Sequence, residues 1–245
     1  MQKENLKGIF FDLYGTLLVF DDFDEANSEW ENSFYEMIGK DKQLNADEIH
    51  KICTEILKMQ IKKEPAGNLT TYETKIKKIF DSKGIDIPIP EIKNIASETV
   101  RIWQKKIRLA EDVHPVIREF KKNNKTIGLI TNFDHAPHVY RLLKENAIGE
   151  LFDVIIISDE AGCEKPCRKI FEIALKSANL SAAETVYIGD NLRDDIEGAF
   201  NAGINPILID RKLKSHNSDA AVRQTGITIN YQVIFSLSEL PGILS

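Results

Sequence analysis

Seven side chains that could do chemistry together stand at or after the ends of short apolar runs. They are Asp12, Thr131, Asn132, Lys165, Asp190, Asp194 and Asp195. A carboxylate can attack phosphorus or carbon and form a covalent intermediate. Separated aspartate oxygens suit Mg²⁺, which also binds substrate phosphate. Lysine can neutralise charge, and a threonine hydroxyl with backbone N–H groups can bind the remaining oxygens, so the set is chemically coherent.

An alternation of strands and helices must bring these residues together. The unalternated apolar run 8–11, which ends at Asp12, suits a strand buried on both faces. From His114 onward, further patterns alternate: we expect strands at 126–131, 154–158, 185–188 and 206–209, and helices at 137–146, 168–178 and 196–202. Such alternation predicts a parallel sheet, and ligands bind such sheets at the carboxyl ends of the strands.

The segment 21–112 carries helical patterns and no strand that the sequence supports. Asn45 with Glu48 has the spacing of a capping box, and Thr70 can cap another helix. Apolar residues recur at helical spacing across 26–38, 49–57, 72–80 and 92–107. Four consecutive helices predict a small bundle inserted after the first strand.

The chain is long enough for one large domain or two small ones, with 245 residues of which 42% are hydrophobic. We expect an α/β fold, with a Rossmann-like parallel-sheet core over 1–18 and 113–245 and a helical insertion over 19–112. The 38 acidic and 32 basic residues give a net charge of −6. This balance excludes a strongly basic nucleic-acid binder, and the hydrophobic content excludes a disordered chain.

Cysteine usage and the N-terminus indicate the compartment. The sparse, odd set Cys53, Cys163 and Cys167 is no disulfide framework and predicts reduced thiols that serve packing. No run approaches the ~20 apolar residues of a membrane span. The polar start of the chain lacks the plan of a signal peptide. We therefore expect a cytoplasmic protein that binds neither membrane nor nucleic acid.

Four motifs stand in order along the chain: FFDLYGTLL, LITN, EKP and YIGDNLRDD. In order and spacing they resemble the haloacid dehalogenase superfamily, and the helical insertion resembles that family's cap domain. The surrounding residues are similar to its subfamily I hydrolases, in the haloacid dehalogenase-like hydrolase domain group. The resemblance implies a Mg²⁺-dependent phosphatase that hydrolyses a small phosphate ester or acyl phosphate through an aspartyl-phosphate intermediate. It also implies a small phosphorylated substrate, for a monomer or homodimer.

The resemblance also implies the roles of the metal and catalytic residues. Asp12 would be the nucleophile, and Lys165 would stabilise charge. Asp190 would hold Mg²⁺ together with Asp12 and the backbone carbonyl of Tyr14. Asp195 would support the metal, and the choice between it and its neighbour Asp194 stays open. The phosphoryl-binding group would be Thr16, Thr131, Asn132 and Lys165.

One residue departs from the pattern of the family's phosphatases. Tyr14 occupies the place of a second aspartate that protonates the leaving group and then activates water. Tyrosine, with an ordinary pKa of ~10, is a poor general acid near neutral pH. Three consequences stay open: a leaving group that needs no proton, an acid supplied by His135, His138 or the cap, or slow turnover. The loop position of the two histidines favours exposed side chains.

Two other functions stay open. The run around Tyr14 also resembles the 2-haloacid dehalogenases, whose halide product needs no proton. Asp190 opposes that function because a metal-free site does not need an acidic group there, and 1–100 contain no arginine to stabilise a halide. The third possibility is a weakly catalytic protein of this family that binds a phosphorylated ligand.

Overall fold

The computed structural model describes the chain except for residues 1–4, 21, 62–67, 212–218, 225–226 and 245. Contacts between Cα atoms divide it into two compact units. The core unit comprises Met1–Val19, Leu109–Asn132 and Leu143–Ser245, and the helical unit comprises Phe20–Arg108 and Phe133–Leu142. The sequence indicated an insertion after the first strand, but not the second segment of the helical unit. The predicted domain boundaries stay a prediction.

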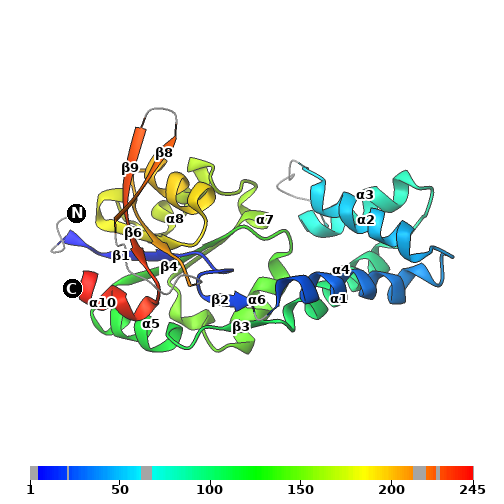
Figure 1. Cartoon of the computed structure of the whole chain (residues 1–245), viewed down its shortest axis with the longest axis horizontal. Coiled ribbons are helices and arrows are strands. Elements are labelled where there is room, and N and C mark those ends of the chain that lie inside the picture. Colours follow the sequence, from blue (N-terminus) through cyan, green and yellow to red (C-terminus); the bar gives the residue numbers. More distant parts are fainter. Residues whose placement is uncertain (1–4, 21, 62–67, 212–218, 225–226, 245) are drawn as a thin grey trace. The chain divides into compact units, whose positions relative to one another are not determined.

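The core unit is built on one sheet with the strand order β5-β4-β1-β6-β7-β9-β8 (Figure 1). The strands are β1 (Gly8–Phe11), β4 (Thr126–Thr131), β5 (Val154–Ile157), β6 (Thr185–Gly189), β7 (Asn205–Ile209), β8 (Asp219–Gln224) and β9 (Ile227–Ile234). All neighbours pair in parallel except β8 with β9. The predicted α/β fold with a parallel sheet is therefore confirmed. β1 lies between β4 and β6, so the carboxyl ends of these three strands are adjacent.

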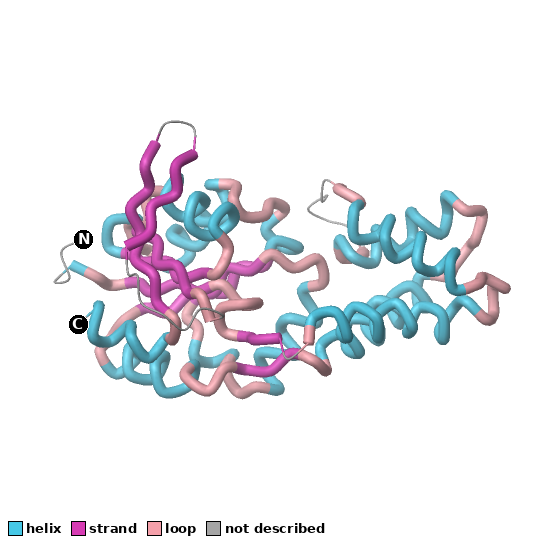
Figure 2. The backbone as a smooth tube through the Cα atoms, viewed as in Figure 1, coloured by secondary structure: helices cyan, strands magenta, loops and turns pink. Residues whose placement is uncertain are grey.

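Helices cover both faces of this sheet (Figure 2). They are α5 (Val113–Lys122), α7 (Ser158–Ala161), α8 (Arg168–Ala178), α9 (Gly198–Asn201) and α10 (Leu240–Leu244), while α6 (Ala136–Glu145) spans the boundary between the units. On one face, Phe171 of α8 packs with Phe10 of β1 and Tyr187 of β6. Strands covered on both sides explain the unalternated apolar runs of the sequence.

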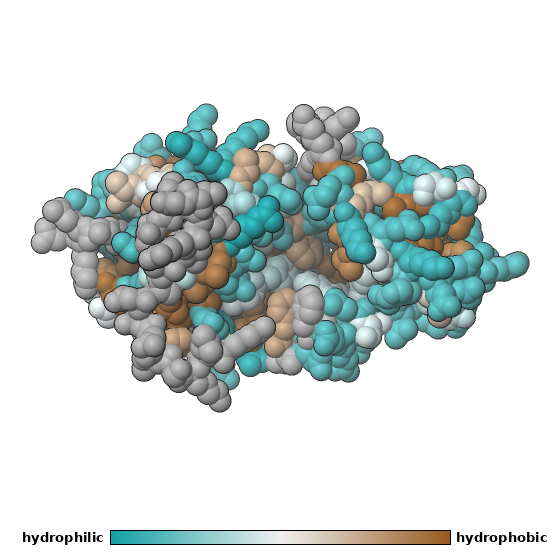
Figure 3. Space-filling model, turned by 45° about the horizontal axis from the view of Figure 1, so that its top comes forward, coloured by the Kyte–Doolittle hydropathy of each residue, from teal (hydrophilic) through white to brown (hydrophobic). Residues whose placement is uncertain are grey.

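The helical unit contains α1 (Phe23–Phe34), α2 (Ala46–Lys58), α3 (Thr71–Ser82) and α4 (Ile89–Gln104). Capping boxes start α2 at Asn45 and α3 at Thr70, as the sequence predicts. The helices bury one apolar cluster that includes Trp30 and Phe80. Hydrophilic side chains cover most of this unit's surface on the face drawn in Figure 3, as expected for helices that bury one stripe.

The structure corrects several predicted elements. The segment 21–112 is not free of strands, because Ile107–Leu109 forms β3 and pairs with β2 (Leu18–Phe20). These strands are too short to show a period of two. Strands β8 and β9 and helix α10 follow the last predicted strand and were not predicted. Among the described residues, no helix combines the length and apolar character needed to cross a membrane.

Candidate active site

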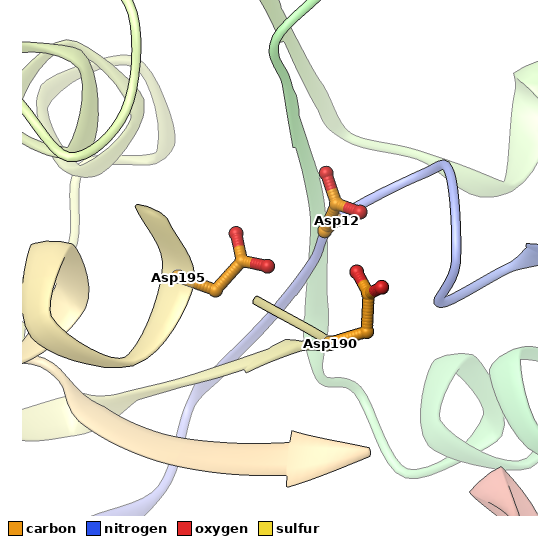
Figure 4. A group of neighbouring side chains, drawn as sticks. All are labelled: Asp12, Asp190 and Asp195. Atoms are coloured by element: carbon orange, nitrogen blue, oxygen red, sulfur yellow. The ribbon is translucent and has the colours of Figure 1, made fainter. Parts of the chain in front are cut away.

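Three aspartates converge at the carboxyl ends of β1 and β6 (Figure 4). Asp12 directly follows β1, and its backbone N–H donates to the Ile188 carbonyl of β6 over 2.9 Å. Asp190 directly follows β6, and Asp195 lies on the wide helical turn η5 (Leu192–Glu197). One carboxylate oxygen from each lies within 4.8 Å of the others. Parallel pairing thus places side chains together that are 178 residues apart in sequence.

Lys165 lies among these carboxylates and is only 4% exposed. Its ammonium donates to Oδ1 of Asp12 over 2.6 Å and to Oδ1 of Asp195 over 2.6 Å. A third bond of 2.9 Å runs to the hydroxyl of Tyr187. An ammonium has three donors, so the protein's own groups occupy all of them. A buried charge needs such partners, since burial without them is very costly.

Asn132 holds the loop that carries Lys165. Its Nδ2 donates to the Lys165 carbonyl over 2.9 Å, and its Oδ1 accepts from the Lys165 backbone N–H over 2.8 Å. This reciprocal pair joins the end of β4 to the lysine loop. The family resemblance implies that Asn132 contacts substrate oxygens through its side chain or its backbone, and that role stays a prediction. In the structure its side chain holds Lys165 in position.

Two glycines let the backbone approach the carboxylates closely. Gly15 has a φ of +92°, and a Cβ there would clash with the carboxylate of Asp190. A Cβ on Gly189 would clash with the carboxylate of Asp195. The loop with Tyr14 and Gly15 is therefore seated against Asp190, and the end of β6 against Asp195. A side chain at either glycine would displace the neighbouring carboxylate from its place in the site.

Two threonine hydroxyls of the predicted phosphoryl-binding group are buried without a partner. Among the described residues, only three buried side-chain nitrogen or oxygen atoms lack a hydrogen bond, and Oγ1 of Thr16 and Oγ1 of Thr131 are two of them. Buried polar atoms in folded proteins are almost always paired. Two such hydroxyls, one just after β1 and one at the end of β4, are free to donate to an oxygen-rich ligand.

The charges of the site shift its pKa values. Burial raises the pKa of Asp12, Lys165 lowers it, and the charges of Asp195 and Asp190 raise it again, so that it lies at about 7. Burial alone lowers the pKa of Lys165, but Asp12 and Asp195 outweigh burial and raise it above its usual value. Burial is the main cause of the raised pKa of Asp12, and the charges of Asp195 and Asp190 add to it. A cation bound there would offset that negative charge.

The two neighbouring aspartates after β6, Asp194 and Asp195, make different contacts. Asp195 is buried, and its two oxygens accept from Lys165, from the Tyr187 hydroxyl over 3.1 Å and from the Asn191 backbone N–H over 3.0 Å. Asp194 is only partly buried, and burial and Asp195 raise its pKa. Asp195 therefore orients Lys165 directly, and Asp194 has no comparable contact among those described.

Tyr187 is a site residue that the sequence analysis missed. Its ring is fully buried in β6, and its hydroxyl lies 3.1 Å from the Ile130 carbonyl as well as contacting Lys165 and Asp195. The available signal was a tyrosine inside the apolar run TVYIG, because a buried hydroxyl needs a partner. The run was interpreted only as a strand.

The two histidines considered as a substitute acid are buried, so the expectation of exposed side chains is wrong. His135 is 4% and His138 is 3% exposed, and both belong to the helical unit. His138 Nδ1 accepts from Arg141 over 2.9 Å, and its Nε2 lies 3.2 Å from Gln104 Oε1. Burial, with the charges of Arg141 and His135, lowers the pKa of His138 to about 3. A histidine that holds no proton near neutral pH is a poor general acid.

Comparison with known proteins gives a consistent result. The model of the haloacid dehalogenase-like hydrolase family matches residues 9–209. The chain is 27% identical over 243 residues to a glyceraldehyde 3-phosphate phosphatase of Methanothermobacter thermautotrophicus, covering 98% of this chain and 100% of that protein. Two solved structures, each 20% identical and covering 98% of both chains, are a HAD phosphatase from Thermococcus onnurineus (TM-score 0.68) and a 2-haloacid dehalogenase from Pseudomonas syringae (TM-score 0.69).

The parallel sheet and the carboxylate–lysine cluster at its strand ends define a hydrolase of the α/β class with an aspartate as candidate nucleophile. The four sequence motifs, the family-model match over 9–209 and the fold indicate the same family. The chain belongs to the haloacid dehalogenase-like hydrolases. Since the phosphatase and the dehalogenase structures match it almost equally well, the fold by itself does not choose between phosphorus and carbon as the atom attacked.

Proposed function

We propose that this protein is a Mg²⁺-dependent phosphatase that hydrolyses a small phosphate ester or acyl phosphate. The observation that carries the proposal is the cluster of Asp12, Asp190 and Asp195, two of which, Asp12 and Asp195, accept from the buried ammonium of Lys165. The similarity to a glyceraldehyde 3-phosphate phosphatase over nearly the whole chain supports a phosphorylated substrate. We further propose a cytoplasmic monomer or homodimer in which residues 19–112 form the cap.

The donor set of the site fits Mg²⁺. Carboxylate oxygens are the hard ligands that this cation prefers, and one oxygen from each of the three aspartates lies within 4.8 Å of the others. Asp12, Asp190 and the backbone carbonyl of Tyr14 would hold the ion, while Asp195 would support the site through Lys165. When bound, Mg²⁺ supplies charge neutralisation for phosphoryl oxygens and for the attacking carboxylate.

In the proposed reaction, an oxygen of Asp12 attacks the phosphorus atom. The bond from phosphorus to the leaving oxygen breaks, and an aspartyl phosphate forms. Water then attacks that phosphorus, releases inorganic phosphate and restores the carboxylate. Lys165 keeps Asp12 oriented through its 2.6 Å bond. The unpartnered hydroxyls of Thr16 and Thr131 would donate to phosphoryl oxygens.

Tyr14 narrows the choice of substrate. Burial and the charge of Asp12 raise its pKa further above the ordinary value, so its proton is even harder to give up. An acyl phosphate releases a carboxylate, which needs no proton. We therefore propose that acyl phosphates, or esters with good leaving groups, are the better substrates.

Dehalogenation is the second candidate, and Tyr14 is the observation that favours it because a halide also leaves without a proton. Asp190 weighs against it. Its carboxylate adds negative charge beside Asp12, which a site working without metal would not need.

Phosphate release tests the proposed function. We would use acetyl phosphate and p-nitrophenyl phosphate, each with Mg²⁺ and with EDTA, and Asp12→Asn as the control. Asn keeps the shape of the side chain but is no nucleophile, so we expect turnover to fall at least about a thousandfold while the fold stays intact. Release that persists in pure Asp12→Asn protein would remove Asp12 as the nucleophile. Halide release from 2-chloropropionate without phosphate release would establish the second candidate instead.

A further inference from the structure

One arginine outside the carboxylate cluster holds the chain segment that follows the nucleophile. We propose that Arg211, oriented by Asp112, is a positioning residue that fixes the loop 13–18 beside Asp12. Its effect on catalysis rests on the proposed function, whereas its effect on the loop can be measured independently.

Arg211 and Asp112 form a forked ion pair within the core unit. Nη1 of Arg211 donates to Oδ2 of Asp112 over 3.1 Å, and Nη2 donates to Oδ1 over 2.9 Å. The two side chains are 17% and 15% exposed. Oδ2 also accepts from the Ser236 hydroxyl and the Leu237 backbone N–H, each over 2.8 Å. With its carboxylate held from two sides, Asp112 fixes the plane of the guanidinium.

The Nε–H group of the same guanidinium contacts the loop 13–18. Nε of Arg211 donates to the backbone carbonyl of Thr16 over 2.9 Å. Because the guanidinium is planar and rigid, the fork to Asp112 also sets the direction of the Nε–H bond. Asp112 therefore acts on Thr16 through Arg211, and the contact is made to backbone rather than to a side chain.

The loop has its own backbone hydrogen bonds, which make its state measurable. The Gly15 N–H donates to the Leu18 carbonyl over 2.7 Å. The N–H groups of Leu17 and Leu18 both donate to the Leu13 carbonyl, over 2.9 and 2.8 Å. Amides bonded in this way exchange with solvent only when the loop opens. The carbonyl held by Arg211 lies in the middle of this turn.

Displacement of the loop would reach the site directly. Gly15 is seated so closely on Asp190 that no Cβ fits between them. Tyr14 precedes it, and its carbonyl is a proposed metal ligand. Thr16 follows it, and its unpartnered hydroxyl is a proposed phosphoryl ligand. Arg211 thus sets groups for both metal and phosphate without touching either.

Hydrogen exchange followed by mass spectrometry tests the position of the loop. In Arg211→Ala, loss of a charge-assisted bond to Thr16 should make amides of 13–18 exchange about tenfold faster or more. Peptides from β7 and β9 should keep wild-type rates. The matched control is Arg118→Ala, which removes an exposed arginine of α5 and should leave all these rates unchanged. If Arg211→Ala does not fold, Arg211→Lys carries the test, because an ammonium cannot serve Asp112 and Thr16 as a planar fork does.

Activity gives a second, independent measurement. We expect the Mg²⁺ concentration for half-maximal phosphate release to rise about tenfold in Arg211→Ala, and KM for the substrate to rise as well because the hydroxyl of Thr16 is displaced with the loop. Unchanged exchange of 13–18 in a folded Arg211 variant overturns the proposal. So does an equal increase in every core peptide, since Arg211 would then support the fold as a whole. A wild-type protein that hydrolyses no phosphate would refute the proposed function, yet the exchange result would still decide the role of Arg211.

Discussion

At the scale of single residues, the three donors of Lys165 determine how a substrate can bind. Two of its acceptors are carboxylates, and the third is the neutral hydroxyl of Tyr187. Hydrogen bonds between charged groups are the stronger ones. A phosphoryl oxygen that contacts Lys165 therefore replaces Tyr187 at less cost than it replaces Asp12 or Asp195. In this structure the Tyr187 hydroxyl is the third acceptor that holds the ammonium in place.

Tyr187→Phe tests this role. The change removes only the hydroxyl and keeps the ring. That ring packs edge-on against Phe171, with the two ring centroids 5.2 Å apart. We expect kcat to fall about tenfold and the unfolding free energy to fall by about 1 kcal/mol, since Lys165 and Asp195 each lose a partner. Tyr231→Phe, at a buried tyrosine of β9, is the control and should leave kcat unchanged. Equal kcat for both variants would show that the hydroxyl does not position Lys165.

At the scale of elements, the turn after β1 and the end of β6 bring backbone unusually close to carboxylates. Gly15 and Gly84 both have positive φ, at +92° and +71°. A Cβ on Gly15 would clash with Asp190, whereas nothing lies within 4 Å of one on Gly84. An alanine at Gly84 introduces backbone strain alone, whereas an alanine at Gly15 also disturbs Asp190. Comparing the two variants therefore separates these effects.

Gly15→Ala and Gly84→Ala should both lower the unfolding free energy, by about 1 kcal/mol for the strained φ alone. Only Gly15→Ala should also displace Asp190, so we expect it to lose at least about tenfold in apparent Mg²⁺ affinity, equivalent to one hydrogen-bonded contact. Urea denaturation and Mg²⁺ titration of activity measure the two effects. A similar Mg²⁺ response in both variants would contradict the role given to Gly15.

Elements were predictable where burial leaves a clear pattern. The strand 126–131 and the helix 168–178 have the predicted bounds, because both are long and mostly buried on their inner sides. The helix expected at 196–202 begins earlier, at Leu192, since Asn191 accepts from the N–H groups of Arg193 and Asp194. That turn is polar, so hydrophobic periodicity did not reveal it.

At the scale of the whole molecule, the second segment of the helical unit is the least expected feature. Residues 133–135 come soon after β4, with Asn132 between, and they contact the start of α3. The Tyr72 N–H donates to the Asp134 carbonyl over 2.8 Å, Lys75 pairs with Asp134 over 2.6 Å, and Thr70 Oγ1 lies 3.0 Å from His135. These contacts join residues about 60 positions apart in the sequence. A local pattern of residue types cannot predict contacts over that separation.

Buried His138 makes this unit sensitive to acid. The folded protein keeps His138 neutral to about pH 3, whereas a histidine in the unfolded chain takes a proton near 6.5. The unfolded state therefore binds more protons between these values. The stability from neutral His138 is complete above about pH 6.5 and is lost progressively as pH falls toward 3. The contribution of His138 alone makes the urea midpoint drop between pH 7.5 and 5, whereas the raised pKa of Asp12 acts in the opposite direction over the same range.

His138→Gln should reduce that drop, because glutamine does not titrate. The matched control is His50→Gln, at a histidine of the same unit whose side chain is 66% exposed. The comparison uses the difference between the two pH values, so a general loss of stability in His138→Gln does not affect it. A wild-type drop in that variant would mean that another group controls the acid response.

The candidate site was predictable as far as its residues are tied to strand ends. Asp12, Lys165, Asp190 and Asp195 were chosen because parallel strands end at one edge, and the structure brings all four together. Tyr187 and Arg211 were not chosen, because each acts through a contact across the sheet or to a backbone carbonyl. Residue type and spacing carry no record of such contacts.

The carboxylates around Lys165 have a consequence for the sequence of binding events. With all groups ionised, the three aspartates and Lys165 carry a net charge of −2, which equals the charge of a phosphate dianion. Repulsion between the two favours a compulsory order, in which the divalent cation enters before the phosphorylated compound. Calorimetric titration with inorganic phosphate should therefore register heat of binding in Mg²⁺ and none in EDTA. Equal binding in both solutions would rule out an ordered pathway.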